Sequence, residues 1–119
     1  TFPIEAAMIA ANIAPGMDRS FTAEEWENLI PKKEWYAAIT EAEDMVDRHL
    51  LETKENRFGK LVDIQGYDID PAMIPVCREN AERAGVLSLI HFQERDIAKM
   101  SHGKKHGVLM TNPPYGERI

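Results

Sequence analysis

Apolar residues are spaced differently in the two halves of the chain. From Ile4 to Ile13 nearly every residue is apolar, which is typical of a helix buried on all sides. Residues Thr22 to Glu25 have the spacing of a capping box and predict a short helix that stops near Pro31. From 32 to about 55 apolar residues recur every three or four positions, which predicts one long amphipathic helix. Its apolar stripe consists of Trp35, Ile39, Ala42, Val46 and Leu50.

The first helix also carries start and stop signals. Thr1 can cap it, and Pro3 and Glu5 are favoured in a first turn. Pro15 disfavours helical conformation at the residue before it, so we expect the helix to end at Ala14.

The second half alternates strand and helix patterns. Residues 61–69, 89–92 and 107–111 predict three strands. Asp70 and Pro71 form a cap and a first helical position, and the helix that follows ends at Gly85. A helical turn is expected at 97–100. This order predicts an α/β, Rossmann-like fold with parallel strands and flanking helices.

Composition narrows the class of protein. The chain has 119 residues, enough for one domain, and a single Cys, which excludes a disulfide framework and a cysteine zinc site. We therefore expect a reducing, cytoplasmic location, and no apolar run is long enough to span a membrane. The net charge of −6 implies that any nucleic acid is held mainly by other parts of a larger protein. Both ends read as though cut from a longer sequence.

Ligands of open α/β sheets bind at the carboxyl ends of the strands. Asp68 and Asp70 follow the first predicted strand, where a carboxylate can accept hydrogen bonds from both ribose hydroxyls of a cofactor. We assign the ribose to Asp68 and the helix cap to Asp70; two solvated loop acids are the alternative. After the second strand, Asp96 can accept from an adenine amine, with Ile97 against the ring, although an acid before a helical turn is often only a cap.

The third predicted strand ends in Asn112-Pro113-Pro114-Tyr115. Two prolines fix φ and remove two backbone donors, which leaves an acceptor cluster beside a flat aromatic ring. This cluster suits a planar base with an exocyclic amine: the acceptors bind the amine hydrogens and Tyr115 stacks on the base. The simpler alternative is a proline-rich turn at the end of a strand.

These motifs, together with Thr1 to Ala7 and the string Gly66 to Pro71, resemble the class I S-adenosylmethionine-dependent methyltransferases. The similarity is greatest to the THUMP-associated RNA methylase family, which includes the ribosomal RNA guanine-N2 methyltransferases; some members are described as N6-adenine-specific DNA methylases. The resemblance implies S-adenosyl-L-methionine as cofactor and RNA, specifically 23S ribosomal RNA, as substrate. It also implies that Asn112, Pro113 and Tyr115 are catalytic, holding and stacking on the target base. The implied cofactor-binding residues are Thr1, Asp68, Ile69, Asp96, Ile97 and Asn112.

The resemblance also implies missing parts. Residues 1–119 would be the central part of a catalytic domain, with a helical insertion at about 17–57. The family's first strand, with its glycine-rich loop, the C-terminal strands and the RNA-binding THUMP domain would lie outside it. That first strand would sit between the strands at 61–69 and 107–111. We therefore expect the isolated chain to be inactive, to bind cofactor weakly and to self-associate through exposed strand edges.

Three alternatives stay open at this stage. An N6-adenine methyltransferase on DNA or RNA would use the same turn. A nicotinamide-dependent oxidoreductase shares the ribose carboxylate but leaves Asn112 to Tyr115 without a role. A noncatalytic Rossmann-like module is the third. We expect no metal site, since His102 and His106 lie in a polar loop, and Cys77 is expected on the apolar face of its helix.

Overall fold

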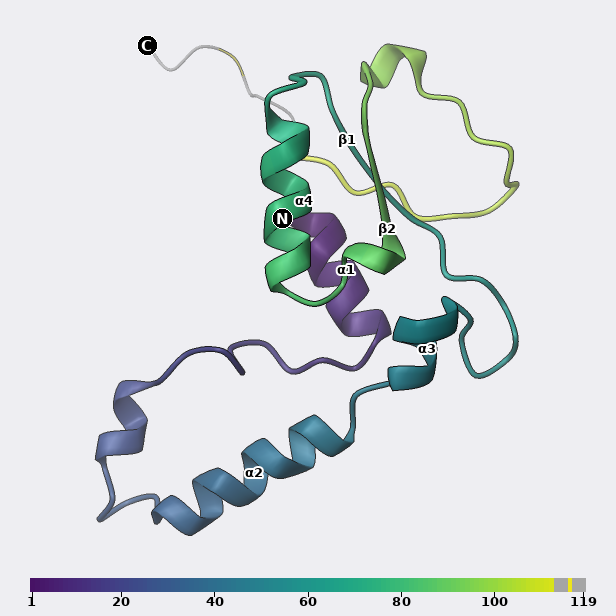
Figure 1. Ribbon diagram of the computed structural model, residues 1–119. Helices are drawn as coiled ribbons and strands as arrows, with labels where there is room; N and C mark the ends of the chain where they lie inside the picture. Colours follow the sequence, from purple (N-terminus) through teal and green to yellow (C-terminus); the bar gives the residue numbers. More distant parts are fainter. Residues whose placement is uncertain (113–115, 117–119) are drawn as a thin grey trace.

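The computed structural model describes residues 1–112 and residue 116 (Figure 1). Two parallel strands and the helices against them form the body of the molecule, and a helical lobe projects from it. Within the described residues no helix is long and apolar enough to cross a membrane. The elements in chain order are α1 (Phe2–Ala10), η1 (Thr22–Glu25), α2 (Lys32–Asp44), α3 (Arg48–Thr53), β1 (Ile64–Asp68), α4 (Met73–Arg83), η2 (Leu87–Leu89), β2 (Ile90–Glu94) and η3 (Ile97–Lys99).

The predicted α/β fold with parallel strands is confirmed. Strands β1 and β2 pair in parallel, with Ile64 opposite Ile90 and Asp68 opposite Glu94, so their carboxyl ends are level. Helix α1 packs against β1 and α4 against β2, and both helices lie to the left of the strands in Figure 1. Alternate strand residues face this helical layer and are buried, while His91 between them is exposed. The core consists of Ala7, Ala11, Leu50, Ile74, Ala81, Val86, Leu89, Ile90 and Phe92.

Gly66 lies at the tightest point of this packing. A Cβ atom built on Gly66 would lie 2.6 Å from a ring carbon of Phe92 and 3.0 Å from Cγ of Pro3. Carbon atoms in contact prefer a separation of about 3.5–4.0 Å. The absence of a side chain at Gly66 therefore allows α1 and the Phe92 ring to approach β1.

Helix α1 departs from its prediction in three ways. It is not buried on all sides, because Ile9 is 78% exposed whereas Ala7 is fully buried. The side chain of Thr1 makes no capping hydrogen bond, although its backbone oxygen accepts from Ile4. The helix ends at Ala10 rather than Ala14, because Asn12 adopts a left-handed conformation with φ of 54°.

The predicted long helix from 32 to about 55 is wrong. The structure has α2 and α3 instead, separated at residues 45–47. Asp47 causes the break: its Oδ1 accepts a hydrogen bond from the backbone N–H of Leu50 at 2.9 Å and so caps a new helix. The apolar spacing continues across the break, and for this reason the pattern alone suggested one helix.

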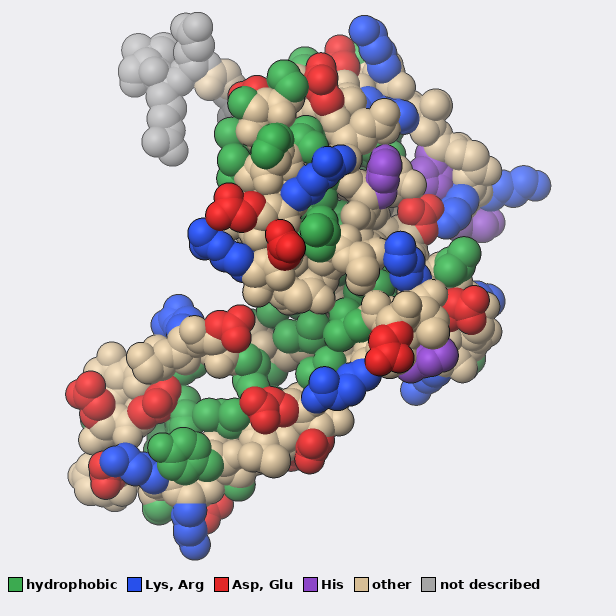
Figure 2. Space-filling view, viewed as in Figure 1, with side chains coloured by type: hydrophobic (Ala, Val, Ile, Leu, Met, Phe, Trp, Pro, Cys, Tyr) green, Lys and Arg blue, Asp and Glu red, His purple; other side chains and the backbone are tan. Residues whose placement is uncertain are grey.

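Residues 11–47, between α1 and α3, form the lobe at the lower left of Figure 1, and we call them the acidic lobe. Its two ends are held together by two hydrogen bonds. The backbone N–H of Asp47 donates to the oxygen of Ala11 at 2.8 Å, and the Asn12 side chain donates to the oxygen of Met45 at 2.9 Å. The space-filling view in Figure 2 shows acidic side chains spread over this lobe.

The third predicted strand is wrong as well. Residues 107–111 have no strand pairing, and Val108 is 91% exposed. A strand is stable only when its backbone groups bond to a neighbour, and among the described residues β1 pairs with β2 alone. The apolar composition of residues 107–111 predicts a strand. No further strand that could pair with it lies among the described residues.

Candidate functional site

The carboxyl ends of β1 and β2 bring two predicted site residues to the same edge of the sheet. Asp68 is the last residue of β1, and Asp96 lies two residues beyond the end of β2. The backbone N–H of Arg95 donates to the carbonyl oxygen of Asp68 at 2.8 Å, which ties the two chain segments together past the last strand pair. Asp68 and Asp96 are both half-buried. The structure therefore places both residues at the carboxyl edge of the sheet, and their ligand-binding role stays a prediction.

Each acid at this edge also shapes its own turn. Oδ1 of Asp68 accepts from the N–H of Asp70, Oδ1 of Asp70 from Ala72, and Oδ1 of Asp96 from Ala98, each at 2.9 Å. The predicted N-cap is wrong: α4 begins at Met73 with Ala72 as its N-cap, so Asp70 shapes the preceding turn and Pro71 is not the first helical position. The simpler role of Asp96, a cap before a helical turn, is present.

One oxygen of each carboxylate remains available at this edge. Among the described residues no donor contacts Oδ2 of Asp68 or of Asp96. A fixed carboxylate with one unengaged oxygen can accept hydrogen bonds from a ligand hydroxyl or amine. Ile69 and Ile97 lie directly beside the two acids and are 68% and 63% exposed, so both can cover an apolar ring.

A pair that the sequence analysis did not identify lies beside Asp68. The guanidinium of Arg95 lies over the ring of Tyr67, with its Cζ 5.0 Å from the ring centroid. The side chain of Arg95 also donates to Gln93 at 3.0 Å, and the Tyr67 hydroxyl donates to Gln65. These contacts fix the Arg95 guanidinium on the strand face that carries Tyr67. The strand register, which the sequence pattern does not give, places 67 next to 93 and hence near 95.

Two other predicted site residues, Thr1 and Asn112, make no hydrogen bond to this edge within the described part of the chain. Thr1 is exposed at the start of α1, and Asn112 is exposed at the end of an extended segment. Pro113 and Tyr115 lie outside the described residues. The acceptor cluster predicted at Asn112 to Tyr115 therefore stays a prediction.

The segment that leads to Asn112 is anchored to the start of β1. Lys104 Nζ lies 2.6 Å from a carboxylate oxygen of Asp63. Hydrogen bonds from Lys104 and from Gln65 lower the pKa of Asp63 below its usual range. Lys104 thus fixes where the chain passes the amino end of the sheet.

A metal centre finds no support in the described part of the chain, where no group of three or more His, Cys, Asp or Glu side chains gathers. The single Cys77 is partly buried against the core, as predicted for a structural thiol. The chemistry available at the sheet edge is therefore hydrogen-bond acceptance by carboxylates beside exposed apolar side chains. That combination suits a nucleoside, with hydroxyls for the acids and a flat base for the isoleucines.

Comparison with known proteins points the same way. The model of the UPF0020 family, described as RMKL-like, methyltransferase domain, matches residues 1–119. The chain is 39% identical over 122 aligned positions to the ribosomal RNA large subunit methyltransferase K/L of Vibrio parahaemolyticus, covering 100% of this chain and 16% of that protein.

Two solved structures are similar as well. The crystal structure of a possible methylase from Clostridium difficile 630 matches with a TM-score of 0.80 and 41% identity, over 98% of this chain and 28% of that one. The crystal structure of SMU.472 complexed with SAH matches with a TM-score of 0.79 and 36% identity, over 99% and 28%. The chain spans between 16% and 28% of the curated relatives that it matches.

Proposed function

The chain belongs to the UPF0020 family of RMKL-like methyltransferase domains, and from that premise we propose that its protein methylates an exocyclic amine of a nucleobase in RNA. The proposed methyl donor is S-adenosyl-L-methionine, and the proposed target is guanine N2 in 23S ribosomal RNA. The chain's similarity to a ribosomal RNA methyltransferase supports an RNA target. The solved relative complexed with SAH supports the cofactor, because SAH is what the donor becomes after it loses its methyl group.

The observation that carries the proposal is the pair of acids at the level carboxyl ends of β1 and β2. We assign Asp68 to the ribose hydroxyls, because its Oδ1 is held by Asp70 and its Oδ2 faces no donor of the described chain. We assign Asp96 to the adenine amine and Ile97 to the adenine ring, since Ile97 is exposed beside that acid. The residues present fit an adenosyl group: a fixed acceptor for hydroxyls, another acceptor for an amine, and apolar side chains for a ring.

When bound, the cofactor supplies an electrophilic methyl group on a sulfonium. The chain's own contribution is position, which is the main source of rate in a direct transfer. Asn112 and Pro113 would accept hydrogen bonds from the target amine and aim its lone pair, while Tyr115 would stack on the base after it leaves its helix. Thr1 and Ile69 would line the cofactor site from α1 and from the end of β1. These roles rest on the sequence motif and on the family.

Nucleoside mass spectrometry of ribosomal RNA from a strain lacking the gene tests the target. We expect one N2-methylguanosine to disappear and to return with the wild-type gene. Loss of an N6-methyladenine from RNA or DNA would instead establish the second candidate function, methylation of adenine N6. The acceptor cluster predicted at Asn112 to Tyr115 would serve either amine. Unchanged nucleosides in both would contradict the proposal.

The role of Asp68 is tested separately by cofactor binding. In the full-length protein, calorimetry with S-adenosyl-L-methionine should show binding that Asp68→Asn weakens about tenfold or more, since a buried charge-assisted hydrogen bond contributes about 1.5–3 kcal/mol. Glu79→Gln, on the exposed face of α4, is the matched control and should bind normally. Equal affinity of Asp68→Asn and wild type would exclude Asp68 from the ribose site. Failure of the wild-type protein to bind the cofactor would favour a noncatalytic module.

A further inference from the structure

The acidic lobe carries the entire net charge of the chain. It contains nine of the twenty acidic residues and three of the fourteen basic ones, which gives −6, the charge of the whole sequence. The remaining residues balance at eleven of each sign. The nine acids of the lobe are Asp18, Glu24, Glu25, Glu27, Glu34, Glu41, Glu43, Asp44 and Asp47.

The lobe lies away from the predicted catalytic edge. It leaves the body after α1 and rejoins it at α3, whose Leu51 oxygen accepts from Ser88 just before β2 begins. It therefore attaches at the amino ends of the strands, whereas Asp68 and Asp96 stand at the carboxyl ends. In Figure 1 the two regions occupy opposite ends of the molecule. A ligand of the lobe would not be the base or cofactor that those acids are proposed to bind.

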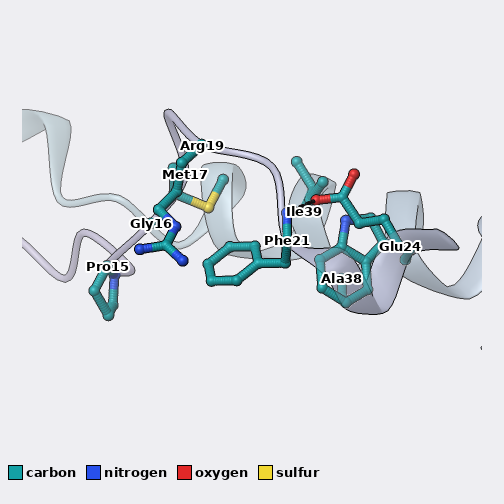
Figure 3. Close-up of a pocket in the computed structure, with 9 residues that line it drawn as sticks. Pro15, Gly16, Met17, Arg19, Phe21, Glu24, Ala38 and Ile39 are labelled. Atoms are coloured by element: carbon teal, nitrogen blue, oxygen red, sulfur yellow. Dashed lines mark hydrogen bonds between the residues drawn. The ribbon is translucent and has the colours of Figure 1, made fainter. Parts of the chain in front are cut away.

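The lobe contains a pocket of about 160 Å³, far more than the ~10–15 Å³ that one water needs. In Figure 3 the Phe21 ring lies between Arg19 on one side and Ala38 of α2 on the other. The guanidinium of Arg19 lies 4.4 Å from the Phe21 ring centroid, and the rings of Phe21 and Trp35 are 6.0 Å apart at 58°. The lining residues are Pro15, Gly16, Met17, Arg19, Phe21, Glu24, Trp35, Ala38 and Ile39.

One polar atom of the pocket lining has no partner. The indole N–H of Trp35 is buried and makes no hydrogen bond to any described residue. A buried donor without an acceptor is unfavourable, and such donors are nearly always satisfied in proteins. Because this N–H is covered by protein, the Trp35 side chain offers the pocket an apolar wall.

Large apolar side chains are also exposed elsewhere on the acidic lobe. Trp26 is 51% exposed, Leu29 is 70% exposed and Tyr36 is 63% exposed, all within the same acidic segment. Exposed aromatic side chains are enriched at interaction surfaces. In Figure 2 hydrophobic side chains gather in the middle of this part of the molecule, with acidic and basic side chains around them.

We propose that the acidic lobe is a docking surface for a basic segment of a partner protein. An apolar side chain of that segment enters the pocket, and its Lys or Arg side chains meet carboxylates of the lobe. The charge of the lobe argues against a nucleic acid as its ligand, because a net charge of −6 repels a phosphate backbone. The same charge accelerates association with a basic partner.

Fluorescence anisotropy of the full-length protein with labelled peptides tests this. The probes are a Lys/Arg-rich twelve-residue peptide with a central Leu-Leu anchor, the same peptide with Ala-Ala in place of the anchor, and a Ser/Gln peptide with the anchor. We expect the anchored basic peptide to bind at least tenfold more tightly than the other two. We expect its affinity to fall with added salt, because the contacts are between charges at a surface.

Paired variants locate the site. Ala38→Met fills the pocket without disfavouring the helix and should weaken the anchored peptide about tenfold. Ala37→Met, one position along α2 and outside the lining, should bind as wild type. Glu25→Lys in the lobe should weaken binding several-fold, and Glu82→Lys on α4, with the same change of charge, should not.

Several results would overturn the proposal. These are equal binding of the neutral and basic anchored peptides, equal binding by Ala38→Met and Ala37→Met, or no peptide binding at millimolar concentration. Tight binding of an oligouridylate that Ala38→Met weakens would make the lobe an RNA site instead. None of these readouts depends on methyl transfer.

Discussion

Replacing Gly66 with alanine should weaken the pairing of β1 and β2. The new Cβ would lie 2.6 Å and 2.7 Å from two ring carbons of Phe92 and 3.0 Å from Pro3. Either the ring or the backbone must then move by about 1 Å to reach ordinary contact distance. The ring has little room, because Phe92 is only 5% exposed within the core.

Two terms set the magnitude. Overpacking of a core costs about 1–3 kcal/mol, and the upper half of that range applies because both neighbours of the new Cβ are rigid rings. Alanine offsets about 0.5–1 kcal/mol of this cost, because it loses less backbone freedom than glycine on folding. We expect a net loss of about 2 kcal/mol in the local stability of the sheet.

Hydrogen exchange followed by mass spectrometry measures this loss in the full-length protein. Amides of β1 and β2 should exchange about 30-fold faster in Gly66→Ala, because 1.4 kcal/mol corresponds to a factor of ten. Gly103→Ala is the matched control, since a Cβ there meets nothing within 4 Å. Adding Phe92→Leu to Gly66→Ala should recover part of the protection. Unchanged exchange in Gly66→Ala, or equal effects of the two alanine variants, would refute the argument.

Three further predictions concern a helix cap, an ion pair and a strand edge. Asp47→Ala should lower stability by about 1 kcal/mol in urea unfolding, because it removes the hydrogen bond to the N–H of Leu50; Asp44→Ala, at the end of α2, should change it by less than half as much. The Asp63–Lys104 pair stabilises the fold above the usual aspartate pKa of about 3.9, and that contribution is lost as pH falls through the lowered pKa of Asp63. Amides at 100–106 should therefore exchange faster on acidification in the wild type and show no such pH step in Asp63→Asn. The isolated 119-residue chain should form oligomers in light scattering, because one edge of β1 has no partner strand among the described residues; a monomer with a cooperative melt would contradict this.

The sequence predicted those parts of the fold that local patterns determine. The parallel pairing, the helix that ends at Gly85 and the turn after Asp96 all follow from alternation, caps and breakers. These signals act within a few residues, so one sequence is enough to read them. The same holds for Asp68 and Asp96, whose place at one sheet edge follows from topology.

The wrong predictions concern features that depend on contacts between residues far apart in the sequence. Asn12 ends α1 because its side chain reaches Met45, 33 residues away, which no local pattern reveals. Residues 107–111 have a strand composition, but a strand needs a neighbour that the described chain does not provide. The contact of Arg95 with Tyr67 depends on the strand register, which alternation of apolar residues does not determine.

Two hydrogen bonds join residues 11 and 12 to residues 47 and 45, so the acidic lobe is an insertion whose two ends are held together. Its ends meet at one point of the body, so a change in its length or composition need not alter the path of α1 or α3. Insertions succeed where chain ends lie close together at a surface. The lobe can therefore diverge, or be exchanged for that of a relative, independently of the sheet that carries Asp68 and Asp96.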